Sequence, residues 1–372
     1  LGVLNIPVNV GVPVNVGFVD FNGNSASQDG GAIDSDSGGV GNVNIVSASF
    51  ENNTAASNGG AIETTDPLYV NNSSFTGNKA LGSDTGGYGG AIDSYMNNDS
   101  GQQQQILGSI FTSNSAAING GAIDTSDDAA ITDDTFLNNS AGEDGGAIAN
   151  EQTEATLDVT DSGFFKNNAT QNGGAIENFG SLYVSSVNVF PFTYPGGAMF
   201  FGNTAQGNGG AIDSVSNSAG TALNISGTNG RLQIQATFTG NEAVTGSGGA
   251  VNTADNTTLN IDSFSGNKAG IAGGAVNAIG NNGFTTLTVT ASIFDSNQVT
   301  GAAGTGNAIS TSANTDVETS SFTNNSAANP AATDDGGAIA YIVRNVNDPP
   351  TPFNSSLTVN QDYFGSNDAT VD

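Results

Sequence analysis

The segment that decides the fold runs from Phe50 to Ile62 and has the sequence Phe-Glu-Asn-Asn-Thr-Ala-Ala-Ser-Asn-Gly-Gly-Ala-Ile. It contains two signatures, Phe-x-x-Asn and Gly-Gly-Ala-Ile, and both recur along the chain. The second signature, or a close variant, occurs eleven times, with its alanine at Ala32, Ala61, Ala91, Ala122, Ala147, Ala175, Ala211, Ala250, Ala275, Ala308 and Ala338. The mean interval of about 31 residues indicates a repeat protein.

A copy of Phe-x-x-Asn precedes every one of these positions. Of the 20 phenylalanines in the chain, twelve occupy this slot: Phe21, Phe50, Phe75, Phe111, Phe136, Phe164, Phe200, Phe238, Phe264, Phe294, Phe322 and Phe364. An asparagine follows three residues after each of them, and an alanine two residues later in all copies but one, where Val299 replaces it. Two signatures in a fixed order predict one structural unit per repeat.

A third element precedes the phenylalanine and alternates apolar and polar residues, as a strand does. It is visible as Val14-Asn15-Val16, Val43-Asn44-Ile45, Leu68-Tyr69-Val70, Leu157-Asp158-Val159, Leu259-Asn260-Ile261, Leu287-Thr288-Val289 and Leu357-Thr358-Val359. Each repeat therefore offers three short strands separated by Gly, Asn, Asp and Ser. No segment has a convincing helical period, so the predicted class is all-β.

Repeats this short bury an apolar face only by stacking on one another. We therefore predict a right-handed parallel β-helix of 11 to 12 coils with three short strands per coil, with equivalent residues about 4.8 Å apart along its axis. The rings would form an internal stack and the Asn amides a hydrogen-bonded ladder. Residues 14–372 form one β-helix domain, with loop insertions near 94–107, 185–199, 214–231 and 342–356, and residues 1–13 form a separate apolar strand.

Composition excludes several functions. The chain has no Cys and no His, which excludes Cys or His metal ligands, Cys or His nucleophiles and a Ser-His-Asp triad. With 35 acidic side chains, five basic ones and a net charge of −30, it should repel nucleic acid and anionic membranes. No apolar run reaches the roughly 18 residues that a membrane span needs. These features predict a non-enzymatic protein without nucleic-acid partners.

The two signatures resemble the repeats of the chlamydial polymorphic outer-membrane proteins and of related bacterial surface proteins. The resemblance covers about residues 21–369. It implies an exported protein that displays a β-helical passenger at the cell surface and takes part in adhesion. The expected location is therefore extracellular or on the cell surface.

The residue after the Ile of the second signature is acidic in four successive repeats, at Asp34, Glu63, Asp93 and Asp124. If the Ile points inward, alternation directs these carboxylates outward, in a column about 4.8 Å apart. The first interpretation is a plain solvated row. The alternative is a Ca²⁺ site, because Ca²⁺ could bridge such carboxylates. No other cofactor is predicted.

One interruption of the repeat is rich in aromatic residues and prolines, with Phe190, Phe192 and Tyr194 next to Pro191 or Pro195. Insertions in a solenoid form outer loops that often bind partners, which makes these residues a candidate contact loop. The alternative is a local lid that folds back on the rod. The segments around Gln102–Gln105 and Asp348–Phe353 are interpreted as spacers.

The two ends look complementary. The apolar stretch before Pro13 is a surplus strand, and the last repeat stops where a Gly-Gly-Ala-Ile element would begin. Strand addition between copies would join them head to tail. Two alternatives remain, a cap formed by residues 1–13 and a fragment cut at a repeat boundary. The predicted self-assembly residues are Leu1, Val3, Leu4, Ile6, Val8, Val10, Phe364, Asn367, Ala369 and Val371.

The sequence thus predicts a non-enzymatic extracellular structural protein, a subunit of a head-to-tail surface fibre or an adhesive stalk. Its partners would be further copies of itself and a host or neighbouring-cell surface. The alternatives are a monomeric adhesin passenger and a β-helical polysaccharide lyase or hydrolase.

Overall fold

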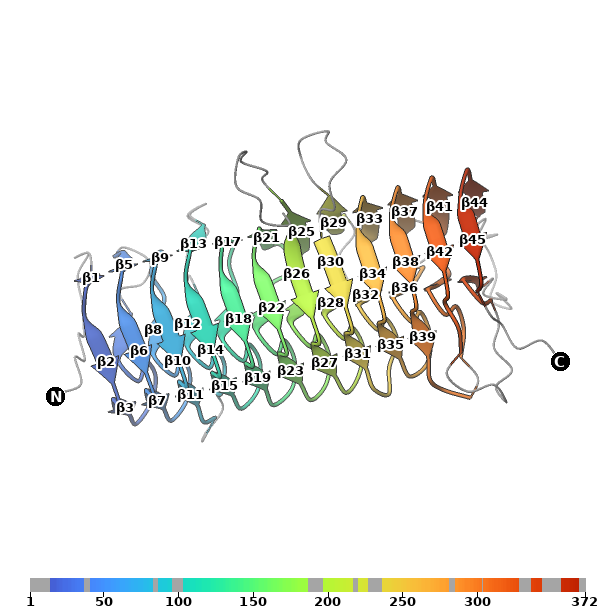
Figure 1. Ribbon diagram of the computed structural model, residues 1–372. Coiled ribbons are helices and arrows are strands. Elements are labelled where there is room, and N and C mark those ends of the chain that lie inside the picture. Colours follow the sequence, from blue (N-terminus) through green and yellow to red (C-terminus); the bar gives the residue numbers. More distant parts are fainter. Residues whose placement is uncertain are drawn as a thin grey trace, which may run out of the picture.

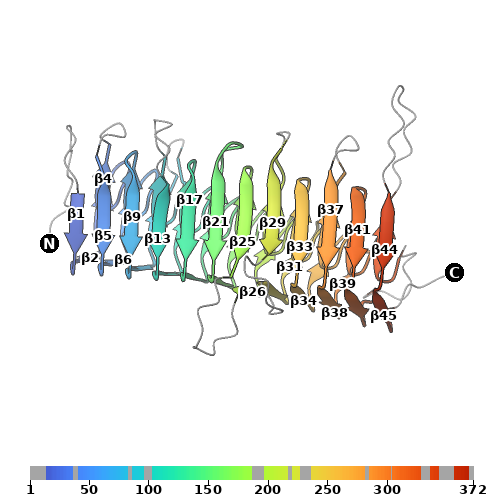
Figure 2. The ribbon, with the colours of Figure 1, turned by 90° about the horizontal axis from the view of Figure 1, so that it is seen from above.

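The structure is a straight stack of coils in which β1 lies at one end and β45 at the other (Figures 1 and 2). It is a computed structural model that describes residues 14–36, 41–82, 86–95, 103–186, 197–216, 220–226, 236–280, 285–302, 304–327, 336–342 and 356–367. Every assigned element in these ranges is a β-strand. The strands form four sheets, here called A to D, that run along the rod.

Sheets A and B come first in each coil, and sheet A has the longest strands. Sheet A consists of β1 (Val14–Gly17), β5 (Val43–Val46), β9 (Leu68–Asn71), β13 (Gln104–Leu107), β17 (Ala129–Thr132), β21 (Thr156–Thr160), β25 (Ser181–Ser185), β29 (Ala222–Ser226), β33 (Asn256–Asn260), β37 (Thr286–Thr290), β41 (Asn314–Glu318) and β44 (Leu357–Asn360). Sheet B consists of β2 (Asp20–Asn22), β6 (Ser49–Glu51), β10 (Ser74–Thr76), β14 (Ile110–Thr112), β18 (Thr135–Leu137), β22 (Gly163–Phe165), β26 (Ala198–Phe201), β30 (Ala236–Thr239), β34 (Ser263–Ser265), β38 (Ile293–Asp295), β42 (Ser321–Thr323) and β45 (Tyr363–Gly365).

Sheets C and D follow in each coil. Sheet C consists of the two-residue strands β3 (Ser25–Ala26), β7 (Thr54–Ala55), β11 (Lys79–Ala80), β15 (Ser115–Ala116), β19 (Ser140–Ala141), β23 (Asn168–Ala169), β27 (Thr204–Ala205), β31 (Glu242–Ala243), β35 (Lys268–Ala269) and β39 (Gln298–Val299). Sheet D consists of β4 (Ile33–Ser35), β8 (Ile62–Thr64), β12 (Ile92–Ser94), β16 (Ile123–Thr125), β20 (Ile148–Asn150), β24 (Ile176–Asn178), β28 (Ile212–Ser214), β32 (Val251–Thr253), β36 (Val276–Ala278), β40 (Ile309–Thr311) and β43 (Ile339–Tyr341).

The chain passes through sheets A, B, C and D in turn and then enters the next coil. Every strand pairs in parallel with its equivalent in the neighbouring coil, as β6 does with β2 and β10. The path winds as a right-handed helix along the rod (Figures 1 and 2). The predicted right-handed parallel β-helix is therefore confirmed. The three predicted elements lie in sheets A, B and D. Sheet C adds a very short fourth strand, which directly follows the asparagine of the repeated Asn-x-Ala.

The repeated phenylalanines form one continuous stack inside the rod. Neighbouring ring centroids are 4.7 to 5.0 Å apart and the ring planes are within 8° of parallel from Phe21 to Phe364. The ten rings from Phe50 to Phe322 are fully buried. Burying a side chain of this size stabilises the folded state by roughly 1.5 to 3 kcal/mol relative to leaving it exposed. The stack is therefore a major part of the core.

The repeated asparagines form the predicted ladder, and Asn53 shows its pattern. The Asn53 side-chain nitrogen donates to the Asn78 side-chain oxygen in the next coil at 3.0 Å and to the Phe21 carbonyl in the previous coil at 2.9 Å. The Asn53 backbone N–H donates to the same Asn78 oxygen at 3.0 Å. Because the side chain is fully buried, each of these bonds offsets a large desolvation cost. The ladder thus ties three coils together at every step.

The double glycine of the second signature meets two separate backbone demands. Gly59 has a φ of 58°, a conformation that residues with a Cβ adopt at a cost. Gly60 lies so close to the next coil that a Cβ there would collide with the Gly90 carbonyl oxygen. The first glycine therefore makes the turn, and the second permits close approach of the coils.

Three predicted loop insertions overlap strands. β13 occupies the last four residues of 94–107, β26 begins within 185–199, and β29 lies within 214–231. The predicted boundaries are too wide because polar residues such as Gln104 and Asn224 occupy strand positions. The interpretation of Gln104 and Gln105 as part of a spacer is therefore wrong.

The register of one predicted strand also differs. β33 ends at Asn260, and Ile261 has a φ of 62° at the corner that follows. Thr257 and Leu259 point inward instead, at seven and five residues before Phe264. The distance to the phenylalanine, rather than the local apolar pattern, decides which residues enter the core.

We expect Phe136→Ala to destabilise the rod by roughly 3 to 5 kcal/mol, because it opens a ring-sized cavity in the middle of the stack. Denaturant and thermal unfolding followed by circular dichroism measure the loss. The neighbouring Leu137→Ala is a matched control, since Leu137 points outward from the same strand and is only half-buried. Equal effects of the two substitutions would contradict the internal stack.

Candidate functional site

Sheet D aligns the acidic residues of the predicted metal site. Asp34, Glu63, Asp93 and Asp124 occupy equivalent positions in four consecutive coils, paired in register. Ala149 interrupts the row, Glu177 and Asp213 resume it, and Asn252 and Asn277 continue it. We call the six acids together the carboxyl column.

The interpretation of these acids as a solvated row is wrong. Asp93 is 9% exposed and Asp124 is 4% exposed, and Glu63 is half-buried. The strands of sheet D are only three residues long. The turns before and after each strand therefore lie on either side of the column. The Asn119 side chain, in the turn before β16, donates to the Glu151 carboxylate, just after β20, at 2.6 Å. This bond links turns of two neighbouring coils.

Burial changes the protonation of the column. It raises the pKa of Glu63 to about 9, and repulsion from Asp93 and Asp34 adds to that shift. It raises the pKa of Asp93 to about 7, and repulsion from Asp29 and Glu151 adds to it. The same cause raises the pKa of Asp213 to about 7. Desolvation of the charged form likewise holds the pKa values of Asp124 and Glu177 well above the ordinary range. Much of the column therefore holds protons at neutral pH.

In the two coils after Asp213, asparagines take the place of the acids and form hydrogen bonds along the column. The position therefore accommodates a neutral polar side chain. The Asn252 side-chain nitrogen donates to the Asp213 carboxyl at 2.6 Å, and that of Asn277 donates to the Asn252 side-chain oxygen at 2.7 Å. A protonated carboxyl resembles an amide in having a donor and an acceptor. Asp124 and Glu177 each keep one buried oxygen without a hydrogen-bond partner. The column is thus suited to neutral side chains that link coil to coil.

The geometry offers little for calcium. Among the described residues, no three or more Asp and Glu side chains lie close enough to hold one metal ion. Acids arranged in a line would give an ion between two coils few protein ligands, whereas Ca²⁺ takes six to eight oxygens. Calcium binding by Asp34, Glu63, Asp93 and Asp124 stays a prediction.

Part of the predicted self-assembly surface is described. Phe364 stacks on Phe322 at a centroid distance of 5.0 Å, and its ring is 45% exposed. The Asn367 side chain accepts from the Asn325 side chain at 2.9 Å and donates to the Phe322 carbonyl. Leu1, Val3, Leu4, Ile6, Val8, Val10, Ala369 and Val371 lie outside the described residues.

The predicted contact loop, Phe190, Phe192 and Tyr194, also lies outside the described residues. The strand that follows it, β26, carries Phe201, which points outward and is 45% exposed. Phe201 pairs in register with Phe165, and Phe165 with Leu137, along the outer face of sheet B. The sequence analysis missed this apolar strip, although a second apolar residue directly after the repeated Phe was a visible signal.

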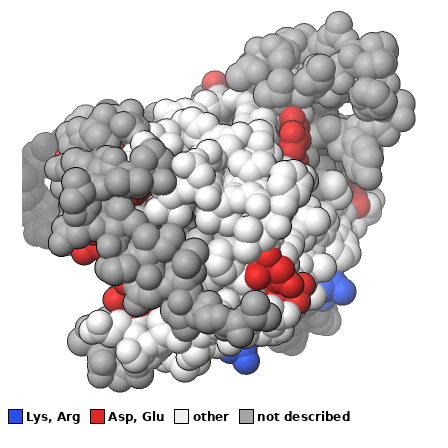
Figure 3. Space-filling view, turned by 90° about the vertical axis from the view of Figure 1, so that its left-hand side faces the viewer, with Lys and Arg blue, Asp and Glu red and all other residues white. Residues whose placement is uncertain are grey.

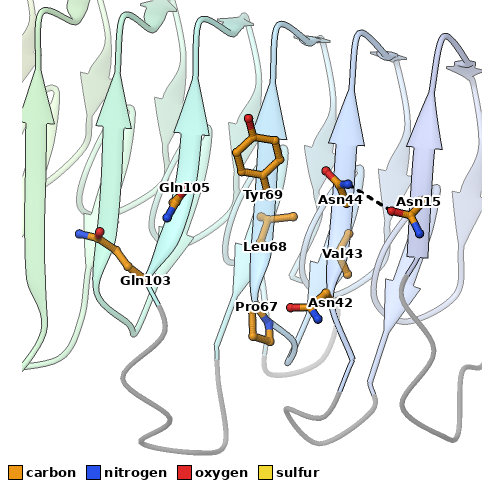
Figure 4. Close-up of a pocket in the computed structure, with 9 residues that line it drawn as sticks. All are labelled: Asn15, Asn42, Val43, Asn44, Pro67, Leu68, Tyr69, Gln103 and Gln105. Atoms are coloured by element: carbon orange, nitrogen blue, oxygen red, sulfur yellow. Dashed lines mark hydrogen bonds between the residues drawn. The ribbon is translucent and has the colours of Figure 1, made fainter.

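A polar groove lies on the outer face of sheet A in the first four coils (Figure 4). It has a volume of about 430 Å³, and none of the described residues that line it is charged. Its polar lining residues are Asn15, Asn42, Asn44, Tyr69, Gln103 and Gln105, and Val43, Pro67 and Leu68 complete it. We call it the amide groove. Sequence reasoning missed it because its residues belong to four separate repeats.

The comparison with known families identifies the repeat. The Chlamydia polymorphic membrane protein repeat matches residues 18–36, 47–65, 108–126, 135–151, 197–214 and 319–340. The chain carries polymorphic membrane protein repeats. Each matched segment begins at or just before a strand of sheet B and ends in or just after a strand of sheet D. No curated protein and no solved structure matches the chain.

The polymorphic membrane protein repeat extends structurally beyond the matched segments. Phe75, for example, lies outside them but stacks between Phe50 and Phe111. The family consists of membrane-associated surface proteins, so the match supports a location at the cell surface. The described part of the chain contains no helix that is long and apolar enough to cross a membrane.

We expect the free energy of unfolding to fall as the pH rises from about 4 to about 9. Unfolded Asp and Glu lose their protons near pH about 4, whereas folded Asp93 and Glu63 have pKa values of about 7 and about 9. In this window the folded state binds more protons than the unfolded state, so raising the pH favours unfolding. Thermal unfolding across this pH range measures the slope.

Glu63→Gln combined with Asp93→Asn should reduce that slope, because two of the titrating groups become neutral amides. Asp20→Asn is the matched control, since Asp20 is exposed on β2. A slope unchanged in the double variant, or stability that rises with pH, would contradict the account of the column.

Proposed function

We propose that the chain is a non-enzymatic extracellular structural protein, a rod that acts as a subunit of a head-to-tail surface fibre or as an adhesive stalk. The observation that carries the proposal is the continuity of the core. The Phe stack and the Asn ladder run without a break from Phe21 and Asn24 to Phe364 and Asn367. Such a stack holds the two ends of the molecule at a fixed separation, which is what a fibre or a stalk requires.

The end of the rod at β44 and β45 supports addition of further strands. There Leu357, Val359 and Phe364 are 37 to 45% exposed, whereas Phe322, one coil further in, is fully buried. A strand supplied in register by a second copy would cover these side chains and extend both sheets. A heterologous contact of this kind, repeated, produces a filament.

The opposite end supports the same arrangement. Seen from the β1 end, the centre and the part just above it are uncharged in the visible described surface, and acidic side chains lie around this area (Figure 3). A net charge of −30 makes rods repel one another at low salt. Contact through the uncharged middle of an end face would reduce this repulsion.

The main alternative class is a β-helical polysaccharide lyase or hydrolase. Glycoside hydrolases place two carboxyl groups on either side of the bond that they cleave. The acids of the carboxyl column are instead shielded by the flanking turns, and Asp93, Asp124, Glu177 and Asp213 are all nine-tenths or more buried. This burial favours a structural role for the column over a catalytic one.

Electron microscopy of the purified protein tests the proposal. The expected particles are rods of roughly 55 to 60 Å, from twelve coils spaced about 4.8 Å apart, either single, as a stalk requires, or joined end to end. If they join, deletion of residues 1–13 should abolish filaments while the rods stay folded. Compact particles without a long axis, or release of unsaturated or reducing sugars from acidic glycans, would contradict the proposal.

A substitution at the exposed end separates fibre assembly from other association. Val359→Asp should block end-to-end joining, because Val359 is 44% exposed at the end of the rod, whereas its partner Val317, one coil further in, is fully buried. Tyr183→Asp is the matched control, since Tyr183 is also exposed but lies in the middle of the rod on β25. Filaments that persist with Val359→Asp would overturn the end-to-end contact.

A further inference from the structure

We propose that the amide groove binds a neutral carbohydrate chain that lies along the axis of the rod. The groove covers the outer face of β1, β5, β9 and β13 (Figure 4). The inference goes beyond the proposed function and does not depend on end-to-end assembly, because the groove lies on the side of the rod.

The register of sheet A gives the groove its direction. Asn15 pairs with Asn44, Asn44 with Tyr69, and Tyr69 with Gln105, in four consecutive coils. These side chains therefore form a row along the rod with a step of about 4.8 Å. A ligand that follows the row must be extended and must offer similar polar groups at regular intervals. A linear chain of sugar units meets both conditions.

The backbone N–H and C=O groups of the strands beneath the row already pair with neighbouring strands, so they are not available for strand addition by a ligand. β5 pairs with β1 on one side and with β9 on the other, and β9 pairs in turn with β13. A peptide that binds by strand addition needs a free sheet edge. The groove offers side chains alone, which favours a ligand recognised through hydroxyl groups.

The side chains suit sugar hydroxyls. Each amide offers donors and an acceptor, so it can bind two neighbouring hydroxyls at once. The Asn44 side-chain nitrogen donates to the Asn15 side-chain oxygen at 3.1 Å, while the buried Asn44 side-chain oxygen has no hydrogen-bond donor.

Tyr69 adds an aromatic surface in the middle of the row (Figure 4). The Asn71 side-chain nitrogen donates to the Tyr69 hydroxyl at 2.8 Å, which holds the ring in place. An aromatic ring offers a flat apolar face beside a polar tip, and the C–H face of a sugar ring can pack on it. The combination of a fixed ring and flanking amides is suited to a sugar unit.

The charges near the groove select the kind of sugar. Asp66 precedes Pro67, but its carboxylate accepts from the Ser35 hydroxyl and the Gly41 N–H. Asp158 accepts from the Gln103 side chain at 3.2 Å at the far end. The described part of the lining contains no cation, and the whole chain is strongly acidic. A uronate or sulfated chain would be repelled, so the ligand is a neutral glycan.

Binding of the full chain to printed oligosaccharides tests the inference. The panel holds linear neutral oligomers of glucose, mannose, galactose and N-acetylglucosamine, together with uronate-containing and sulfated oligomers. We expect binding to at least one neutral oligomer and none to the acidic ones. Absence of binding to every neutral oligomer, or preference for the acidic ones, would overturn the inference.

Variants locate the site. Tyr69→Ala and Gln105→Ala should each weaken binding at least tenfold in titration with the neutral oligomer. Tyr183→Ala is the matched control, because Tyr183 occupies the equivalent outward position of β25, four coils away. Thermal unfolding of each variant checks that the rod is folded, and Gln105, which is exposed, tolerates truncation. Binding unaffected by both groove variants, or equally weakened by Tyr183→Ala, would overturn the site.

Single rods that bind a neutral oligomer support this inference whether or not filaments form. Filaments without sugar binding would contradict it and leave the structural proposal intact. The two proposals therefore fail separately.

Discussion

The structure depends on one constraint, which is that every coil repeats the previous one in register. The Asn ladder enforces it, because each side chain donates to the coil before and to the coil after and accepts from a backbone N–H as well. A slip of one residue would leave these buried amides without partners, at a cost of about 1 to 3 kcal/mol for each group. The Phe rings stack in the same register, and their burial stabilises it further. The rod is thus specified one coil at a time, and loops between coils change without disturbing the core.

The same constraint also stacks side chains that would not otherwise lie together. In sheet D it brings Asp34, Glu63, Asp93 and Asp124 into one column, where burial raises their pKa values so that neutral forms persist. On the outer face of sheet A it aligns amides and Tyr69 in a row along the rod. A solenoid therefore builds extended surfaces from single residues contributed by several repeats.

The fold was predictable because its signals recur. Phe-x-x-Asn and Gly-Gly-Ala-Ile each mark one role in every coil, so the stack, the ladder and the turns all follow from the sequence. Features that belong to one coil were not predictable in this way. Ile261 looked like a core residue, but its distance from Phe264 puts it at a corner. Asp124 is buried, although alternation within one strand directs it outward. The amide groove depends on register across four coils and so emerges only in three dimensions.

Engineered disulfides measure the register most directly, because the chain has no Cys of its own. Ser49 and Ser74 are paired on adjacent coils, and their hydroxyl oxygens are 3.3 Å apart. Ser49→Cys with Ser74→Cys should therefore form a disulfide within one chain under mild oxidation, since paired strands meet the required Cα separation of about 4.4 to 6.8 Å. Ser49→Cys with Ile110→Cys, two coils apart, should not. Efficient cross-linking of the adjacent pair alone is the predicted result, and failure of that pair or equal cross-linking of both pairs would contradict the stacked register.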